Sequence, residues 1–264
     1  MDHTDLCQRV CDTVHGFLQL GNEVFSAAGA TFVRSRECPR RYDANHVTDI
    51  RCGAAADVER LVARAEREFA GYPYLRFDID PFTPPPFVAR VVLDGYVTSE
   101  TLQLVLEGGL DARSSNISMR HVDTDADWSD YALLQHLEWQ ETTAKLGRPF
   151  DAAVAAEFVT SKRKKSPPVR YWLAWVDGVP RAYVCAWPGR NGVGMVEDLF
   201  THPEFRHRGV ATALIACAVA DARGRGAGPV VIGADSGDTP KLMYAHLGFR
   251  PLLVTRQYMR FVRR

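Results

Sequence analysis

The chain has 264 residues, of which 46% are hydrophobic, and its 32 Lys and Arg residues balance its 32 Asp and Glu residues. This length is sufficient for one large or two medium domains with hydrophobic cores. The balanced charge excludes a general attraction to nucleic acid or to an anionic membrane, so we expect neither as a partner. No stretch approaches the roughly 18 apolar residues of a membrane span, and the polar first residues indicate no secretory signal. We therefore expect a cytoplasmic protein.

Six cysteines occur without a Cys-x-x-Cys pair and without the histidine spacing typical of zinc sites. We predict that they are reduced and mostly buried thiols, and that the protein holds no metal. They are Cys7, Cys11, Cys38, Cys52, Cys185 and Cys217.

In the first half of the chain, a helix predicted over residues 55–71 leads to a strand that ends at Asp80, and Thr83 with Pro84 opens a short helix. Gly108, Gly109 and a polar run over residues 111–116 then interrupt the pattern. We place a domain boundary there, which gives one domain over residues 1–113 and a second over residues 114–264.

The second half is predicted to alternate between strands and helices. Asp177 and Gly178 join two alternating segments and predict a tight hairpin. The predicted strands cover residues 117–121, 171–176, 181–187, 193–201 and 230–234, and the predicted helices cover 127–139, 150–162 and 210–220. Thr239 and Pro240 open a further helix.

Residues 206–211 read Arg-His-Arg-Gly-Val-Ala and connect a predicted strand to an apolar helix. The start of a helix exposes backbone N–H groups and carries a partial positive charge. Gly209 and Ala211 leave room for an anion to approach these groups, and Arg206 and Arg208 add positive charge. This junction therefore predicts a pyrophosphate pocket, and an ordinary strand-to-helix turn is the alternative.

The spacing Arg-x-x-Gly-x-Ala resembles the acyl-CoA signature, Gln/Arg-x-x-Gly-x-Gly/Ala, of the GNAT superfamily of N-acetyltransferases. Further along, Tyr244 to Phe249 matches the Tyr-x-x-x-Gly-Phe motif of the same superfamily. The resemblance implies an α/β protein of the α+β type, with the mixed sheet of the GNAT fold over residues 117–264. The first half repeats the spacing of its helix and strand, so we expect a tandem of two GNAT-like domains.

The first copy is expected to be degenerate. Its loop reads Arg51-Cys52-Gly53-Ala54-Ala55-Ala56, with the glycine one position early and a single arginine. We predict that this domain has lost cofactor binding. Two alternatives stay open, which are a working second site and an unrelated α/β domain.

The resemblance implies that acetyl-CoA is the co-substrate and that its acetyl group moves directly to a primary amine of a small molecule or peptide in a ternary complex. The oligomeric state stays open between a monomer and a homodimer. The residues implied in binding the donor are Leu199, Phe200, Thr201, Arg206, His207, Arg208, Gly209, Val210, Ala211 and Thr212. A non-catalytic acyl-CoA-binding sensor or scaffold is the alternative function.

Two residues are predicted to be catalytic. Tyr244 lies on the helix whose family counterpart protonates the departing thiolate, although packing beside Phe249 would also explain it. Strand alternation would point Glu197 and Asp198 to opposite faces, with Glu197 on the face of Leu199 and Thr201. We therefore predict Glu197 as the base. A carboxylate that binds the acceptor, a strand-edge ion pair, Asp198 and a water-mediated base stay open.

A basic run at Lys162-Arg163-Lys164-Lys165 falls at the end of a predicted helix. Cations are favoured at that end by the helix dipole, and such runs are usually solvated. We therefore predict an exposed helix end and not a ligand site.

Overall fold

The computed structural model describes residues 2–111, 117–237 and 239–261. The helices are α1 (His3–Gln19), α2 (Ala55–Glu68), α3 (Pro85–Leu93), α4 (Asp125–Lys145), α5 (Ala152–Lys165), α6 (Val210–Gly224) and α7 (Pro240–His246), with 3-10 turns η1 (Tyr42–Ala44) and η2 (Pro203–Phe205). The strands are β1 (Glu23–Ala27), β2 (Ala30–Arg34), β3 (His46–Thr48), β4 (Tyr74–Ile79), β5 (Val97–Leu106), β6 (Ser118–His121), β7 (Arg170–Val176), β8 (Val179–Trp187), β9 (Gly194–Thr201), β10 (Val230–Asp235) and β11 (Arg250–Phe261).

The elements predicted for the second half are confirmed. The hairpin of β7 and β8 turns at Asp177 and Gly178, which both have positive φ angles. Asp151 caps α5 by accepting hydrogen bonds from the N–H groups of Ala153 and Val154, which explains why that helix begins where it does. The mixed sheet and its helices confirm the predicted fold class.

The strands form one continuous sheet in the order β1-β2-β3-β4-β11-β5-β10-β9-β8-β7-β6. The last strand of each half is paired within the other half: β5 pairs with β10, and β11 pairs with β4 as well as with β5. The division at residue 113 stays a prediction, and it lies outside the described residues. The exchange of strands means that the two halves share backbone hydrogen bonds across the centre of the molecule.

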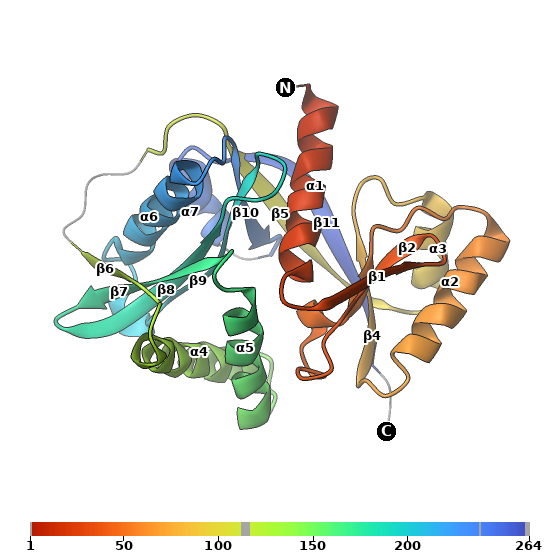
Figure 1. Cartoon of the computed structure of the whole chain (residues 1–264), viewed down its shortest axis with the longest axis horizontal. Helices are drawn as coiled ribbons and strands as arrows, with labels where there is room; N and C mark the ends of the chain where they lie inside the picture. The colour runs from red at the N-terminus through yellow and green to blue at the C-terminus, as the bar shows by residue number, and fades with distance from the viewer. Residues whose placement is uncertain (1, 112–116, 238, 262–264) are drawn as a thin grey trace.

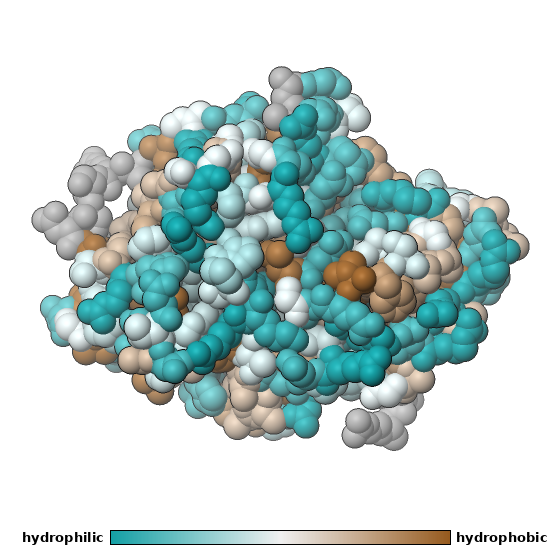
Figure 2. Space-filling view, in the orientation of Figure 1, coloured by the Kyte–Doolittle hydropathy of each residue, from teal (hydrophilic) through white to brown (hydrophobic). Residues whose placement is uncertain are grey.

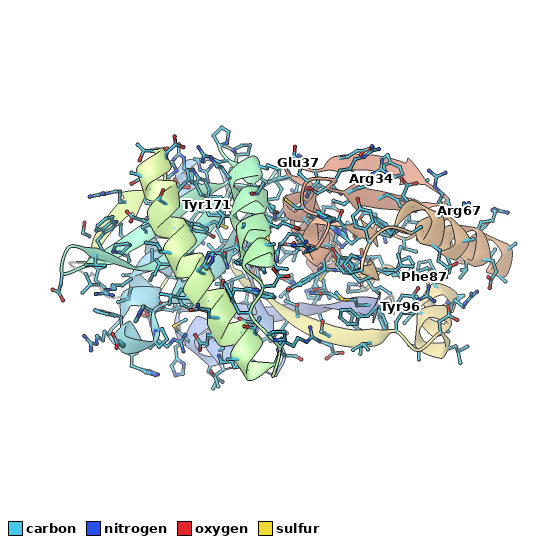
Figure 3. The ribbon with its side chains drawn as sticks, turned by 90° about the horizontal axis from the view of Figure 1, so that it is seen from below. Arg34, Glu37, Arg67, Phe87, Tyr96 and Tyr171 are labelled. Atoms are coloured by element: carbon cyan, nitrogen blue, oxygen red, sulfur yellow. The ribbon has the colours of Figure 1, made fainter. Side chains whose placement is uncertain are left out.

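Helices cover the sheet on both faces. Helices α1, α4 and α5 lie over one face of the second-half strands, and α6 with α7 lies over the other (Figure 1). Figure 3 shows α4 and α5 side by side from below, with Tyr171 between them in the core. The first half has its own apolar core under α2 and α3. Figure 2 shows that the face carrying α1 is mainly hydrophilic, with only small hydrophobic patches.

Helix α1 belongs to the first half by sequence but packs against the second. Val10 and Phe17 are buried in the same core as Trp187 and Val193. The Oγ1 hydroxyl of Thr13 also donates to the carbonyl oxygen of Val193. Figure 1 shows α1 standing between the two parts of the molecule. This helix and the exchanged strands together hold the two halves in contact with each other.

No helix within the described ranges has both the length and the apolar character needed to cross a membrane. The six cysteines are all free, and four of them are buried, as predicted.

Candidate active site

Strand β9 contains a bulge at Asp198. Cys185 of β8 pairs with Glu197, whereas Tyr183 pairs with Phe200, so β9 has one extra residue between these two points. Asp198 occupies this position with a φ angle of 56°, in the left-handed region. The bulge reverses the alternation of side chains beyond it.

The face predicted for Glu197 is therefore wrong. Glu197 follows the face of its partner Cys185, which packs in the core under α4, whereas Leu199 packs in the core under α6. The simple two-residue period holds only for an unbroken strand, and the extra residue shifts every position after it by one. Glu197 and Asp198 both line the same cavities as a result.

Strands β9 and β10 separate at the level of Glu197. They are parallel neighbours, but their pairing covers only three residues of each strand and ends where Ile232 meets Val196. Beyond that point a cavity of about 240 Å³ opens between them. Its lining residues are Glu138, Glu197, Asp198, Leu199, Ile232, Gly233 and Tyr244. The separation exposes backbone groups of both strands that a sheet would otherwise pair.

The two residues predicted to be catalytic meet at this cavity. Tyr244 reaches it from α7 and Glu197 reaches it from β9. The tyrosine is 5% exposed, and its ring lies 6.2 Å from that of Phe249, centroid to centroid. The structure thus contains both the predicted packing contact and access of the residue to the cavity.

Glu197 has an altered acidity. Burial, together with the negative charge of Asp198, raises the pKa of its carboxyl group to about 8. A Cβ built on Gly233 would lie 3.7 Å from Glu197 Oε2 and 3.6 Å from Gln103 Oε1. Gln103 comes from β5 of the first half, and its amide donates to Thr255 at 3.0 Å. Its Oε1 atom is buried without a hydrogen-bond partner among the described residues. Sequence analysis missed Gln103 because β5 was not assigned to this site.

Asp198 is the more strongly bound of the two carboxylates. Lys162 of α5 forms an ion pair with it, and the Cys185 thiol lies 3.6 Å from its Oδ2 atom. Lys162 and Lys165 are 4% and 2% exposed, so the prediction of a solvated helix end is wrong for these two residues. Lys162 points inward because the carboxylate of Asp198 compensates its charge, and the Lys165 ammonium lies 4.0 Å from the centroid of the Phe17 ring. Arg163 fits the prediction, since it lies at the surface and pairs with Asp125.

A second and larger cavity of about 320 Å³ adjoins the first and shares Glu138, Glu197, Asp198 and Gly233 with it. Both halves of the chain line this cavity. The polar residues of the first half that line it include His15, Arg41, Asp43, Arg76, Asp78 and Gln103. The second half adds Gln135, Trp139, Thr142 and Lys162.

The predicted pyrophosphate loop lies between β9 and α6. His207 and Gly209 have φ angles of 61° and 77°, and Gly209 directly precedes the first helical residue. The first intrahelical hydrogen bond from this end runs from the N–H of Ala213 to the carbonyl oxygen of Gly209 at 3.0 Å. The N–H groups of Val210, Ala211 and Thr212 therefore point out of the start of the helix. A Cβ on Gly209 would meet no protein atom within 4 Å.

Residues 131–249 match the model of the acetyltransferase (GNAT) family. The second half of the chain contains a GNAT acetyltransferase domain. The match of these residues to the family indicates acyl transfer as the class of reaction for this domain. The comparison with curated proteins gives no match.

Solved structures with the same fold span nearly the whole chain and not only the GNAT domain. A GCN5-related N-acetyltransferase from Kribbella flavida has 17% sequence identity and a TM-score of 0.71, covering 96% of this chain and 95% of its own. A functionally unknown protein from Staphylococcus epidermidis has 15% identity and a TM-score of 0.68, covering 91% and 94%. A tandem GNAT protein from the clavulanic acid biosynthesis pathway has 15% identity and a TM-score of 0.56, covering 79% and 70%. These likenesses extend the GNAT fold to the first half.

Arg206 of the GNAT domain is bound within the protein. Its guanidinium donates to both carboxylate oxygens of Glu141 on α4, at 2.9 and 2.5 Å, and its Nε donates to the carbonyl oxygen of Thr201. This differs from the prediction of an open rim charge, because a bidentate carboxylate takes up the donors that a phosphate would need. Arg208 and His207 are exposed, with Arg208 lying 5.0 Å from the centroid of the Phe205 ring.

In the corresponding loop of the first half, protein side chains contact the arginine and the glycine. Arg51 pairs with Asp80 at 3.1 Å. A Cβ on Gly53 would lie 3.3 Å from the Cβ of Pro84, so α3 closes the approach to this glycine. Helix α2 begins after Ala54, whose φ angle of −73° differs from the left-handed conformation of Gly209 at the start of α6.

The side chains of His15, Asp49 and Asp80 are close enough together to hold a metal ion, and Arg51 contacts two of these residues. Its Nη2 atom lies 3.9 Å from Asp49 in addition to the contact with Asp80. The Nδ1 atom of His15 lies 2.7 Å from Asp49. A guanidinium that contacts both carboxylates supplies the positive charge that a cation would bring, so these residues form an ion-pair network between α1 and the remainder of the first half.

Proposed function

We propose that this protein is an N-acetyltransferase that moves the acetyl group of acetyl-CoA to a primary amine of a small molecule or peptide. The observation that carries the proposal is that Glu197 and Tyr244 line one cavity where β9 and β10 separate. The start of α6 follows β9 through a short loop with an unobstructed glycine at its end. A candidate base and a candidate acid thus share one cavity, and an anion-binding helix start follows β9 in the chain.

In the proposed reaction the amine nitrogen attacks the carbonyl carbon of the thioester. The C–N bond forms, the C–S bond breaks, and one proton of the amine passes to Glu197. Tyr244 gives its phenolic proton to the departing thiolate and recovers a proton from solvent, to which Glu197 releases one. The raised pKa of Glu197 suits this role because a carboxylate that ionises near neutral pH holds an amine proton more strongly than an ordinary one.

The donor is proposed to lie along the separated strands. The backbone of residues 199–201 would bind the pantetheine arm, and the N–H groups of residues 209–212 would bind the diphosphate. Gly209, with its left-handed conformation and its open surroundings, lets the anion approach these groups. Arg208 would add charge from the exposed rim.

The acceptor is proposed to enter the larger cavity between the two halves. Gln103 lines this cavity together with Glu197, and its Oε1 has no partner within the described part of the chain, so it can accept a hydrogen bond from the amine. In this proposal the first half has no second CoA site, and its residues complete the acceptor pocket.

Free thiol release from acetyl-CoA, measured across a panel of primary amines, tests this function. We expect release that depends on the amine and an acetylated product detected by mass spectrometry. A protein that binds acetyl-CoA tightly but releases thiol with none of the amines would support the alternative of a non-catalytic sensor or scaffold.

A further inference from the structure

We propose that the acceptor of this site carries a carboxylate besides its amine, and that Arg41 and Arg76 bind this carboxylate. The inference rests on the proposed function and specifies its substrate class. Both arginines belong to the first half and line the larger cavity together with Glu197.

Both guanidinium groups have buried donors without acceptors. The Nε and Nη1 atoms of Arg41 and the Nη1 atom of Arg76 have no hydrogen-bond partner among the described residues. The two residues are only 2% and 3% exposed. A buried guanidinium N–H group without an acceptor is unfavourable, so a ligand that supplies acceptors there gains from satisfying it.

The remaining donors of the two arginines hold them in place. Arg41 Nη2 donates to Asp43 at 2.6 Å, and Arg76 donates to both oxygens of Asp78 at 2.6 and 2.9 Å. The Arg41 guanidinium also lies 3.2 Å from the centroid of the Phe158 ring. Such stacking uses the face of the guanidinium and leaves its in-plane N–H groups available. Both groups are therefore held in fixed positions before a ligand arrives.

The charges around this end of the cavity leave room for one anion. Arg41, Lys165, Lys162 and Arg76 all act on Asp43 and lower its pKa despite its burial. Three carboxylates accompany these four cations, and they are Asp43, Asp78 and Asp198. Of the four cations, Lys165 forms no ion pair with an acidic residue within the described part of the chain. Burial and the charge of Lys162 lower its pKa. Glu138 and Glu197 also line the cavity, but burial raises the pKa of both carboxyl groups and so disfavours their charged forms. A monoanion would offset the excess of one cation over the three paired carboxylates.

A carboxylate fits better than a phosphate for two reasons. The free donors lie on two guanidinium planes, which suit the two oxygens of a planar carboxylate. The neighbouring Asp43 and Asp78 would repel a dianion more strongly than a monoanion. Glu197 and Gln103, which line the same cavity, would receive the amine. The acceptor would then span the cavity, with its amine toward the second half and its carboxylate toward the first.

The test compares matched acceptors in which an amino acid and its carboxamide differ only in the charged group. We expect wild-type kcat/KM to be higher for the amino acid by roughly tenfold or more, as for charge-assisted hydrogen bonds in a buried site. Arg76→Gln and Arg41→Gln should reduce this preference toward parity, and Arg76→Lys should restore part of it. Arg36→Gln, at an exposed arginine outside the cavity, should leave the preference unchanged. A merely structural arginine would lower both rates equally and keep their ratio.

A second measurement separates this inference from the proposed function. Calorimetry of a simple monocarboxylic acid with the CoA-loaded protein should show binding that Arg76→Gln weakens, whether or not any amine is acetylated. Absence of such binding, or equal kcat/KM for amino acids and their carboxamides in the wild type, would overturn the carboxylate assignment. Equal acetylation of the amino acid and its carboxamide would leave the acetyltransferase function intact. If neither compound caused thiol release, that function would be contradicted.

Discussion

Lys162 on α5 forms an ion pair with Asp198, and this contact distinguishes the two neighbouring carboxylates of β9. Asp198 is compensated by a buried cation, while Glu197 has a pKa raised by burial and by the charge of Asp198. A general base must release and accept a proton within the working pH range. The ion pair therefore favours Glu197 over Asp198 as the base.

Backbone access at Gly209 should control donor binding. Gly209→Val places a branched side chain in front of the helix start, and we expect CoA affinity to fall by roughly tenfold or more with the fold retained. Gly226→Val is the matched control, because Gly226 also has a positive φ angle and open surroundings but lies at the far end of α6. Calorimetric titration of both variants decides the question, and equal CoA affinity in the two would remove the phosphate-loop assignment.

The two arginines of the loop should behave differently. Arg208→Ala should weaken CoA binding by roughly two- to fivefold at low salt and less at high salt, because an exposed charge contact contributes at most about 1 kcal/mol. Arg206→Ala and Glu141→Gln should have similar, smaller effects, since each breaks the same contact between the loop and α4. If Arg206→Ala weakens CoA far more than Glu141→Gln does, Arg206 contacts the phosphates directly.

One CoA should bind per chain. The loop of the first half has Arg51 paired with Asp80 and Gly53 covered by Pro84, so it offers no open helix start for a diphosphate. Calorimetry on the whole chain measures the stoichiometry. Two equivalents of CoA would contradict the degenerate first copy.

Much of the fold could be predicted from local patterns. The hairpin at Asp177, the helix start at Asp151 and the loop before α6 depend on residues that are close together in the sequence. The exchange of β5 and β11 could not be predicted, because strand pairing between distant segments has no local signal.

The errors at the site have the same origin. An aspartate within a strand pattern does not by itself predict a bulge. The left-handed conformation of Asp198 nevertheless changes which residues of β9 share a face. Lys162 looks like a solvated helix end until Asp198, 36 residues away, is placed beside it. The elements that carry Glu197 and Tyr244 could be predicted because motifs lie on or beside them, and both residues line one cavity, whereas Gln103 carries no motif. Their catalytic roles stay predictions.

Tyr244→Phe tests the proposed acid, because it removes one hydroxyl and keeps the ring beside Phe249. If the phenol protonates the thiolate, turnover should fall by roughly 10²–10⁴-fold with CoA affinity almost unchanged. A tyrosine that only packs would lose little rate and about 1 kcal/mol of stability from a missing hydrogen bond. Steady-state rates and thermal unfolding of the purified variant distinguish the two roles.

The pH dependence of kcat/KM in the wild type and in Glu197→Gln tests the central claim most directly. The base form of Glu197 exists above its pKa, so the wild-type rate should rise with pH through about 8 and then level off. An acceptor whose amine titrates well below that pH keeps its own ionisation out of the profile. In Glu197→Gln, kcat/KM should no longer rise with pH in this range. Its value should be lower than the wild-type plateau by roughly 10²–10⁴-fold. A variant that keeps the wild-type rate and the same rise through pH 8 would contradict Glu197 as the base.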